Sequence, residues 1–540
     1  MLFQQLGQRT YRHGHLACGI GSGASGFNDA EPRVGALRAR FECAGGIDVD
    51  AGAIRHFEKL TGVPGTVMDL FSRDQYISFH GKEPPAGWRE ATPADVRRAF
   101  GDRPLDVLFS SPPCKGLTSL LTPSLAGSRK YAALNELTLR TIWLALESFR
   151  SDPIKIILLE NVPGLGTRGR HLVEQMKALL YSYGYAVNED VHDCGEIGGL
   201  AQHRRRFLLI ARHIEKVPPF IYRPEKLPMK GIGDVIGHLP LPGDPRAGPM
   251  HRIPALQWKT WLRLAFVEAG RDWRSLSELD VVDGHLRDWG LASEDGTIRP
   301  CVDQAPLNHP HNRVLGVQRW NSPSGTVAGA SRAHNGAYSV ADPRCHADAT
   351  YLPAGIPSWR IVPLQQGQPV GSPLPTGGRG GRGKYRVTRL SEPTGTVIAA
   401  STTGEGAFAV ADDLAYPATP GGSLPAPDEQ VLARIIARDG TWHRPITPLE
   451  AACLQSIVDP REIDWDRNWF DLDGANEQTK REWVGNAVPR AAAKGMANAI
   501  GTALLLADSG ERFTLSSQEI WATPLAISLS LSDDRERPAL

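Results

Sequence analysis

Several features of extracellular and membrane proteins are missing from this sequence. The 540 residues contain seven cysteines, an odd number, and no C-x-x-C pair. A disulfide framework and a structural zinc site are therefore not expected, whereas a reducing, cytoplasmic setting is. The N-terminus has no signal-peptide pattern, and no apolar run approaches the length of a membrane span. These absences predict a protein that binds neither a membrane nor a metal ion.

A large excess of charge of one sign is absent too. The formal net charge of +1 argues against binding a polyanion over the whole surface, but it allows a local basic face. The chain is long enough for two or more domains, each with its own hydrophobic core. We expect it to act as a monomer.

The first part of the chain alternates short apolar runs with helical patterns, which predicts an α/β fold with a mostly parallel sheet. The expected strands are His15–Cys18, Gly45–Val49, Leu105–Phe109, Ile154–Leu159, Tyr185–Asp190 and Arg206–Ala211. The expected helices are Glu136–Phe149 and Leu172–Tyr183. Because this pattern fades after residue 212 and helical patterns return near 439, we predict four segments. They are an α/β domain (1–212), an insertion of largely β or irregular structure (213–438), a return to the first domain (439–507) and a tail (508–540).

The insertion contains an internal repeat. RWNSPSGTVAGASRAHNGAYSVAD begins at Arg319, and RLSEPTGTVIAASTTGEGAFAVAD begins 70 residues later at Arg389, without gaps. Each copy predicts a strand, a turn and a second strand, and two copies are too few for a solenoid. The segment between the copies, PTGGRGGRGKYR, is rich in glycine and basic residues.

A glycine-rich turn follows the first expected strand. In ACGIGSGASG, Ala17–Gly26, glycines let the backbone approach a ligand closely, although a turn without a ligand is about as common. Asp48 ends the second strand, where a carboxylate can accept hydrogen bonds from ribose hydroxyls. Asp69 follows a third apolar run and is a candidate acceptor for an adenine amine. Glycines and two acids at three strand ends predict a nucleoside pocket.

The stretch SSPPCKGLT, Ser110–Thr118, places a thiol directly after two prolines. Prolines restrict the backbone, and the preceding apolar run holds the turn at the end of a strand. Beside Lys115, the thiol of Cys114 would be partly thiolate and therefore nucleophilic. An arbitrary cysteine is more often a buried structural residue, but the prolines and the position favour a nucleophile here.

Charged residues mark two further strands. In IILLENVPGL, Glu160 ends an apolar strand, where a carboxylate is costly to desolvate and is a candidate proton donor. In QHRRRFLLIA, Arg204 and Arg206 share one face and suit a phosphate or a carboxylate. The alternatives are a glutamate exposed to water and a solvated run of charges.

In this order, the motifs P-P-C, E-N-V, Q-x-R-x-R and GNAVP (Gly485–Pro489) resemble those of DNA cytosine-5 methyltransferases. The glycine turn, both acids and the segment Arg444–Gln455 match the same family in the same order. The resemblance covers about 1–212 and 440–507. It implies a Rossmann-like S-adenosylmethionine-dependent methyltransferase domain, into which a target-recognition domain is inserted.

The resemblance implies S-adenosyl-L-methionine as the cofactor and double-stranded DNA as the partner. Cys114 would attack C6 of a flipped cytosine, and Glu160 would protonate N3. Arg206, with Arg204, would hold the base, a phosphate or Glu160. The cofactor-binding residues would be Ala17, Gly19, Gly21, Gly23, Asp48, Val49, Asp69, Leu70, Asn486 and Ala487. The DNA contacts would come from Lys115, Thr118, Arg379, Arg382, Lys384 and Arg386, of which the last four fit a solvated loop equally well.

Two other functions stay open at this point. Some relatives methylate tRNA, and a non-catalytic DNA-binding protein can be built on the same fold. The large insertion, rich in Trp and Arg, favours DNA, and the intact Cys114, Glu160 and arginines favour an enzyme. Restriction-modification, phage-borne methylation and regulatory methylation are equally compatible with the sequence, in a bacterial or phage setting where the protein works at the nucleoid.

Overall fold

The computed structural model describes most of the chain and divides into two units. The described residues are 8–113, 117, 128–220, 223–279, 281–282, 285–293, 296–302, 315–327, 339–346, 358–363, 387–389, 409–411, 424–465 and 469–509. By contacts between Cα atoms, one unit comprises Met1–Met229, Gln455–Ile457 and Asn486–Leu540. The other comprises Lys230–Leu454 and Val458–Gly485.

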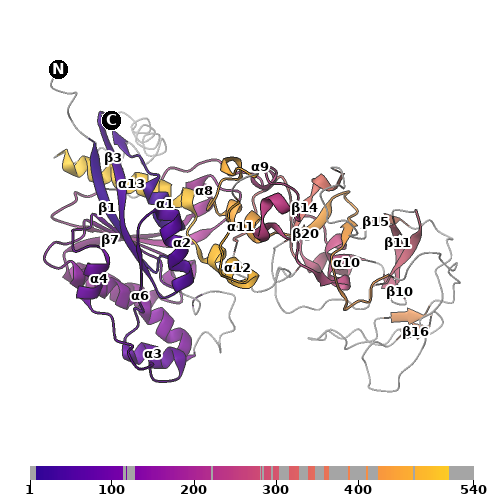
Figure 1. The fold of residues 1–540 in the computed structure, drawn as a ribbon, viewed down its shortest axis with the longest axis horizontal. Helices are drawn as coiled ribbons and strands as arrows, with labels where there is room; N and C mark the ends of the chain where they lie inside the picture. The colour runs from indigo at the N-terminus through magenta and orange to yellow at the C-terminus, as the bar shows by residue number, and fades with distance from the viewer. Residues whose placement is uncertain are drawn as a thin grey trace, which may run out of the picture. The chain divides into compact units, whose positions relative to one another are not determined.

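The first unit is built on a sheet with the strand order β2-β3-β1-β5-β6-β8-β7, and β4 pairs with β3 (Figure 1). The strands are β1 (Arg9–Leu16), β2 (Arg33–Val34), β3 (Leu37–Asp48), β4 (Gly65–Val67), β5 (Val107–Ser110), β6 (Ile156–Asn161), β7 (Tyr185–Asp193) and β8 (Arg205–His213). β4, β3, β1, β5 and β6 are parallel, while β8 runs antiparallel between β6 and β7. The predicted α/β fold with a mostly parallel sheet is confirmed.

Helices cover both faces of this sheet. They are α1 (Ser22–Asn28), α2 (Ala51–Thr61), α3 (Arg73–His80), α4 (Pro93–Ala99), α6 (Arg129–Ser148), α7 (Arg170–Ser182), α8 (Cys194–Gly198) and α13 (Arg490–Asp508). The strands serve two cores, because successive side chains point to opposite faces. Val107 and Phe109 pack with α1, α8 and α13, whereas Leu108 packs with α4, α6 and α7.

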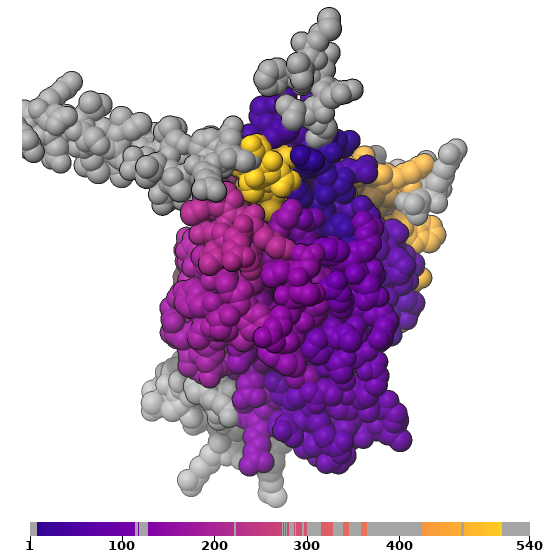
Figure 2. Space-filling view, turned by 90° about the vertical axis from the view of Figure 1, so that its left-hand side faces the viewer, coloured from indigo at the N-terminus to yellow at the C-terminus, as the bar shows by residue number. Residues whose placement is uncertain are grey.

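The C-terminal helix α13 lies against the N-terminal part of the chain. A hydrogen bond of 2.9 Å joins the hydroxyl of Tyr11 to Asp508 Oδ2. On α1, a Cβ added at Gly26 would lie 2.2 Å from the carbonyl oxygen of Arg490, so only glycine permits this approach. Figure 2 shows yellow C-terminal residues beside the indigo N-terminal segments. The sheet therefore depends on a helix from the far end of the sequence.

Strand β3 is longer than its apolar end suggested. We predicted only Gly45–Val49, but the strand has 12 residues, and β2 pairs antiparallel with its start. In its outer part, exposed and buried residues alternate along the strand. Half-buried strands read as alternating patterns, so only the fully buried end of β3 gave the continuous apolar signal.

The second unit contains a sheet of its own, with the order β10-β11-β15-β19-β20-β14-β13 and β12 paired to β11. Its strands are β10 (Val281–Val282), β11 (His285–Ser293), β12 (Ile298–Val302), β13 (Val317–Gln318), β14 (Ser339–Asp342), β15 (Ser358–Pro363), β19 (Arg434–Ile436) and β20 (Trp442–Pro445). Two short pairs join β9 (Leu256–Gln257) to β18 (Gln430–Val431) and β16 (Val387–Arg389) to β17 (Ala409–Ala411). The helices are α9 (Gly233–Ile236), α10 (Trp258–Phe266), α11 (Pro448–Leu454) and α12 (Glu477–Asn486). Trp258, Trp261, Trp359 and Trp442 lie in its main hydrophobic core.

The internal repeat has a structural counterpart. β13 pairs in parallel with β14, with Val317 opposite Ser339, and β16 pairs in parallel with β17, with Val387 opposite Ala409. Both pairs keep the 70-residue offset of the sequence, so the two copies share one strand register. In both copies the two strands pair in parallel, and the predicted turn between them falls largely outside the described residues.

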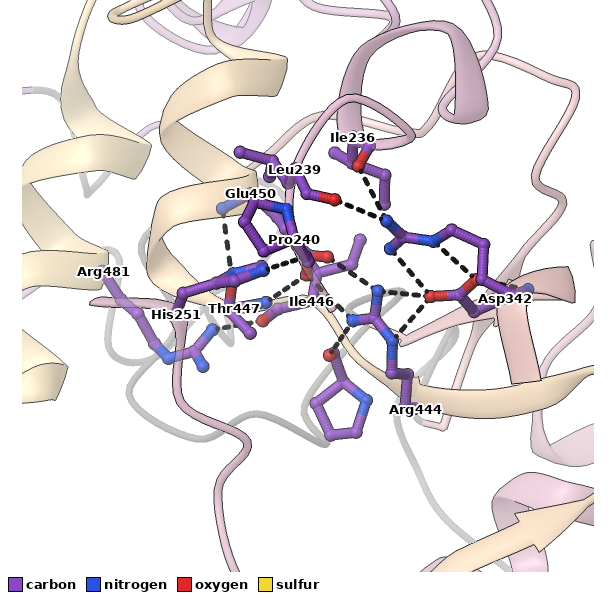
Figure 3. A network of polar contacts seen from close by, with 12 residues as sticks. Ile236, Leu239, Pro240, His251, Asp342, Arg444, Ile446, Thr447, Glu450 and Arg481 are labelled. Carbon is purple, nitrogen blue, oxygen red and sulfur yellow. Dashed lines mark hydrogen bonds and ion pairs between the residues drawn. The ribbon is translucent and has the colours of Figure 1, made fainter. Parts of the chain in front are cut away.

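A largely buried network of charges holds the strand β20 in the second unit (Figure 3). Arg444 donates to Asp342 Oδ2 from Nη2 at 2.7 Å and to Glu450 Oε1 at 2.7 Å, and all three side chains are at most 1% exposed. Arg344 donates to the same aspartate at 3.0 Å and to the carbonyl oxygen of Leu239 at 2.8 Å. The expected return to the first domain covered 439–507; by contacts between Cα atoms, 439–454 and 458–485 belong to the second unit.

Candidate active site

The carboxyl ends of the parallel strands meet along one edge of the first unit's sheet, where α/β proteins bind their ligands. In the strand register, Leu16 at the end of β1 lies between Ile47 on β3 and Ser110 on β5. Ser110 in turn lies beside Leu159 on β6. The next residue of each strand therefore joins a row along this edge, which consists of Asp48, Ala17, Ser111 and Glu160.

The glycine turn after β1 is bonded to Asp48. The backbone N–H of Gly19 donates to Asp48 Oδ2 at 2.8 Å, and that of Asp50 donates to Oδ1 at 3.0 Å. Burial raises the pKa of Asp48, although these two N–H groups oppose the rise. Gly19 and Gly21 have φ values of +53° and +89°, and a Cβ added at Gly19 would meet no atom within 4 Å. The turn thus offers open space beside an oriented carboxylate.

The segment after α12 contacts the first helix of the turn. Ser22 Oγ donates to the carbonyl oxygen of Val488 at 2.8 Å, and a Cβ added at Gly23 would lie 3.5 Å from Val488 Cβ. Asn486, the last residue of α12, is exposed, and Ala487, the next residue, is buried. Both residues were predicted from sequence to bind the cofactor. The contacts with the glycine turn and with α1 are made by Val488, which follows them directly in the sequence.

The turn after β4 holds Asp69 and Leu70. Asp69 Oδ1 accepts from the backbone N–H of Phe71 at 2.9 Å, and Oδ2 accepts from Trp88 Nε1 at 3.0 Å. The side chain of Leu70 is buried, and its carbonyl oxygen accepts from Arg140 Nε at 2.8 Å. Leu70 thus supports the turn from within, while the half-buried carboxylate of Asp69 is held in one orientation.

Two valines at the same edge are unusually exposed. Val49 follows β3 and is 64% exposed, and Val67 ends β4 and is 54% exposed. Val67 lies opposite Asp48 in the register of these strands. Each valine thus exposes apolar side-chain surface next to Asp48, Val49 in the sequence and Val67 across the two strands.

The loop that leads to Cys114 is tied to the glycine turn. The N–H of Ser111 donates to the carbonyl oxygen of Leu16, and its Oγ donates to that of Ala17, both at 3.1 Å. Asn161 Nδ2 donates to the carbonyl oxygen of Pro112 at 3.3 Å. Ala17 itself adopts a left-handed conformation, with φ of +51°. Three hydrogen bonds therefore fix the start of the loop between β1 and β6.

Several predicted site residues lie outside the described part of the chain. They are Cys114, Lys115, Thr118, Arg379, Arg382, Lys384 and Arg386. Leu117, between two of them, is described and buried. Its carbonyl oxygen accepts a hydrogen bond from Arg168, and a Cβ added at Gly164 would lie 2.0 Å from that oxygen. Leu117 therefore packs on the short helix Pro163–Gly166, which follows Glu160 in the sequence.

Glu160 and Arg206 form an ion pair. Arg206 Nε lies 2.8 Å from Glu160 Oε1, and the two side chains are only 12% and 9% exposed. Arg204 is almost fully buried, and its backbone N–H donates to Asp193 Oδ1 at 2.7 Å. Burial and the charge of Arg206 lower the pKa of Arg204, whereas Glu160 raises it. The structure thus brings together the three charged residues that the sequence singled out.

Sequence reasoning missed four supporting residues: Ser111, Asn161, Gln202 and Trp88. Asn161 and Gln202 stand inside quoted motifs but received no role; Gln202 Nε2 donates to Gln455 Oε1 at 2.8 Å, and both residues are buried. Ser111 precedes the two prolines at a strand end, which is a usable signal. Trp88 lies in a loop without a motif, and nothing in the pattern pointed to it.

The sheet order, with one antiparallel strand next to the edge, and the row of site residues define a Rossmann-like S-adenosylmethionine-dependent methyltransferase domain. Residues 11–240 match the model of the C-5 cytosine-specific DNA methylase family. The match is to the family that the motifs predicted, and it covers residues 11–240. It supports methyl transfer to cytosine, with S-adenosylmethionine as the methyl donor.

Solved structures that match the chain include methyltransferases from several organisms. The Entamoeba histolytica methyltransferase EhMeth is 10% identical, with a TM-score of 0.43, over 91% of this chain and 98% of its own. A candidate DNA modification methyltransferase encoded within an E. coli prophage is 15% identical, with a TM-score of 0.40, over 92% and 99%. The S. pombe Dnmt2 methyltransferase is 14% identical, with a TM-score of 0.37, over 93% and 99%. Comparison with curated proteins gives no significant match.

The residues of the turn fit S-adenosylmethionine. Asp48 offers carboxylate oxygens to a ribose, the open side of Gly19 leaves room beside the backbone, and the exposed Val49 offers apolar surface to an adenine ring. No helix in the described ranges is long and apolar enough to cross a membrane. Within the same ranges, no group of three or more His, Cys, Asp or Glu side chains is arranged to hold a metal ion.

Proposed function

We propose that the chain transfers a methyl group from S-adenosylmethionine to C5 of cytosine in double-stranded DNA. The observation that supports this most strongly is the buried Glu160–Arg206 pair at the strand end next to the tethered loop. A carboxyl group at that place can hydrogen-bond the ring nitrogen N3 of a cytosine, and a cation beside it can hydrogen-bond the carbonyl oxygen. The family match supports the same reaction from an independent direction.

The chemistry starts at Cys114. Its thiolate adds to C6 of the cytosine, while the carboxyl group of Glu160 donates a proton to N3, so that negative charge does not accumulate on the ring. C5 becomes the nucleophilic carbon of an enamine. S-adenosylmethionine held at the glycine turn would supply the methyl group, which C5 would take as the methyl–sulfur bond breaks and S-adenosylhomocysteine is left. Loss of the C5 proton to a base then expels the thiolate and restores the ring.

Arg206 and Arg204 orient the acid in this scheme. Arg206 holds Glu160 by its ion pair, which fixes the direction in which the carboxyl group faces. Arg204 adds a second positive charge close to the pair. Preorganised charges of this kind stabilise a transition state without having to reorganise during the reaction.

Duplex DNA is the proposed substrate. The target base must leave the base stack before its ring can be reached, and a separate unit is available whose contacts with the DNA can offset the energetic cost. Flipping one nucleotide costs a few kcal/mol, which contacts elsewhere on the DNA must offset. The second unit has its own sheet and core. A separate unit of this kind can supply the protein surface that reads a DNA sequence from a groove.

We also propose that the basic segment between the repeats contacts phosphates. Arg379, Arg382, Lys384 and Arg386 carry four positive charges within eight residues. Each phosphate contact that is lost lowers the slope of log affinity against log salt by about 0.9. Replacing all four by glutamine should therefore flatten the salt dependence of duplex binding, and an unchanged slope would mean that the segment is a solvated loop.

A direct test offers the protein labelled S-adenosylmethionine with duplex DNA, with tRNA, or with both in competition. The proposal predicts label in the DNA alone, and bisulfite sequencing should then give one recurring sequence context. Label in tRNA alone would assign the protein to RNA methylation. Tight binding of the duplex without any label would indicate a DNA-binding protein without catalytic activity.

A further inference from the structure

The structure carries an inference about a residue outside every motif. We propose that Trp88 is a positioning residue that fixes Asp69 for recognition of the 6-amino group of a purine nucleoside. This inference rests on the proposed function, because it concerns the same nucleoside pocket. It adds the residue that makes the pocket selective for adenine.

The first argument is the hydrogen-bond count at Asp69. A carboxylate has about four acceptor sites, two on each oxygen. The N–H of Phe71 takes one site on Oδ1 at 2.9 Å, and Trp88 Nε1 takes one on Oδ2 at 3.0 Å. One N–H on each oxygen fixes the plane of the carboxylate and leaves acceptor sites free on both. A carboxylate in this state is ready to accept from an amine.

The second argument is that Trp88 is itself held in place. Its backbone N–H donates to the carbonyl oxygen of Pro85 at 3.0 Å, and its ring lies 5.1 Å from the ring of Tyr76. Trp88 belongs to the connection 81–91 between α3 and α4, much of which is exposed. In a connection that is otherwise exposed, a half-buried and hydrogen-bonded tryptophan indicates a specific contact, here the hydrogen bond to Asp69.

The third argument is that the same connection clamps the backbone around Asp69. Glu90 accepts from the N–H of Arg73 at 3.0 Å and from Arg140 Nη2 at 2.7 Å. Arg140 also donates from Nε to the carbonyl oxygen of Leu70 at 2.8 Å. These contacts fix the turn after Asp69, and the N–H of Met68, which donates to the carbonyl oxygen of Asp48 at 2.9 Å, fixes it before Asp69, so only the carboxylate needs a further contact to be oriented. Trp88 supplies that contact.

Position then specifies the ligand. Asp69 follows β4, whose last residue, Val67, lies opposite Asp48 on β3. A nucleoside whose ribose contacts Asp48 and whose ring covers the exposed Val49 and Val67 would direct the edge of its ring toward Asp69. An acceptor at that edge favours a 6-amino purine, whereas a 6-oxo purine presents another acceptor and is rejected.

The test measures the affinity of purified full-length protein for S-adenosylhomocysteine and for S-inosylhomocysteine, by titration calorimetry. Wild-type protein should prefer the adenine compound. Trp88→Phe keeps the ring that packs on Tyr76 but removes the N–H, and it should weaken binding of S-adenosylhomocysteine about tenfold. Binding of the inosine compound should change by less than about twofold, because that ligand makes no favourable contact with the carboxylate.

Two controls make the outcome decisive. Trp469→Phe changes a tryptophan that is 49% exposed in the other unit, and it should leave both affinities at wild-type values. In an Asp69→Asn background, Trp88→Phe should have almost no further effect on selectivity. Equal weakening of both ligands by Trp88→Phe, or no change for either, would overturn the inference. Failure of wild-type protein to bind S-adenosylhomocysteine would instead count against the proposed function.

Discussion

The substitution Glu160→Gln gives the most informative perturbation of the proposed chemistry. It keeps the size and the polar atoms of the side chain but removes the proton that the carboxyl group would donate to N3. General acid catalysis typically contributes a factor of 10² to 10⁴, so we expect a loss of turnover of about that size. This corresponds to about 3–5 kcal/mol of transition-state stabilisation.

The ion pair with Arg206 sets a second magnitude, for stability. The pair is 2.8 Å long and both side chains are at most 12% exposed, so the neutral amide leaves a buried cation without its counter-charge. A hydrogen bond to a charged group contributes about 1.5–3 kcal/mol, and we expect destabilisation of this order. Because that loss leaves most molecules folded at 25 °C, the effect on turnover can be measured separately.

Single-turnover methylation of duplex DNA is the assay, accompanied by duplex-binding and urea-unfolding measurements. Glu189→Gln is the matched control, because it removes another partly buried carboxylate of the same sheet. Glu189 lies on strand β7 and pairs with Arg170 on α7 at 2.5 Å. The control should retain nearly full turnover. Turnover of Glu160→Gln within about threefold of wild type would refute Glu160 as the acid, since that is far below the effect expected of one.

Three further predictions concern stability. Arg444→Met should destabilise the second unit by about 3–5 kcal/mol, because it leaves two buried carboxylates without their cation. Urea unfolding followed by tryptophan fluorescence measures this loss. Arg461→Met changes an exposed arginine and should have little effect, and equal effects of the two variants would contradict the argument. Gly26→Ala should lower the melting temperature, because its Cβ would lie 2.2 Å from the carbonyl oxygen of Arg490, and an unchanged midpoint would contradict the close approach. Burial lowers the pKa of His13 from its ordinary 6.5 to about 4, so the unfolded chain binds the proton first and stability falls as pH drops below 6.5. His13 should contribute about 2 kcal/mol of this loss at pH 5, and His13→Asn should reduce the loss by about that amount; a wild-type curve that is flat between pH 7 and 5 would refute the assignment.

Much of the first unit was predictable because its signals are local. A fully buried parallel strand is a short apolar run, so strands such as Ile156–Asn161 stand out in the sequence. Residues that end such strands must lie at one edge of the sheet, which is why Asp48 and Glu160 could be assigned to a common site. The direction of β8 was not predictable, because a buried strand has the same pattern whether it runs parallel or antiparallel.

The remaining features depend on contacts between residues far apart in the sequence. Trp88 contacts Asp69 across a connection whose composition indicates only a surface loop. Arg444 lies 102 residues from Asp342, and no periodicity reveals that the two share a buried ion pair. That ion pair links 439–454 to β14 within the second unit, although the helical pattern of these residues is like that of the first unit. Pattern predicts elements well, and it predicts long-range polar partners poorly.

The central claim is that the thiol of Cys114 forms a covalent bond to cytosine, and trapping tests it most directly. Duplex DNA that contains 5-fluorocytosine at the target should hold the enzyme after methyl transfer, because fluorine at C5 cannot leave as the proton does. We predict a stable protein–DNA adduct that requires S-adenosylmethionine, with the modified peptide containing Cys114, and no adduct from Cys114→Ala although duplex binding is kept. An adduct at another residue, or methylated product from Cys114→Ala, would contradict the account.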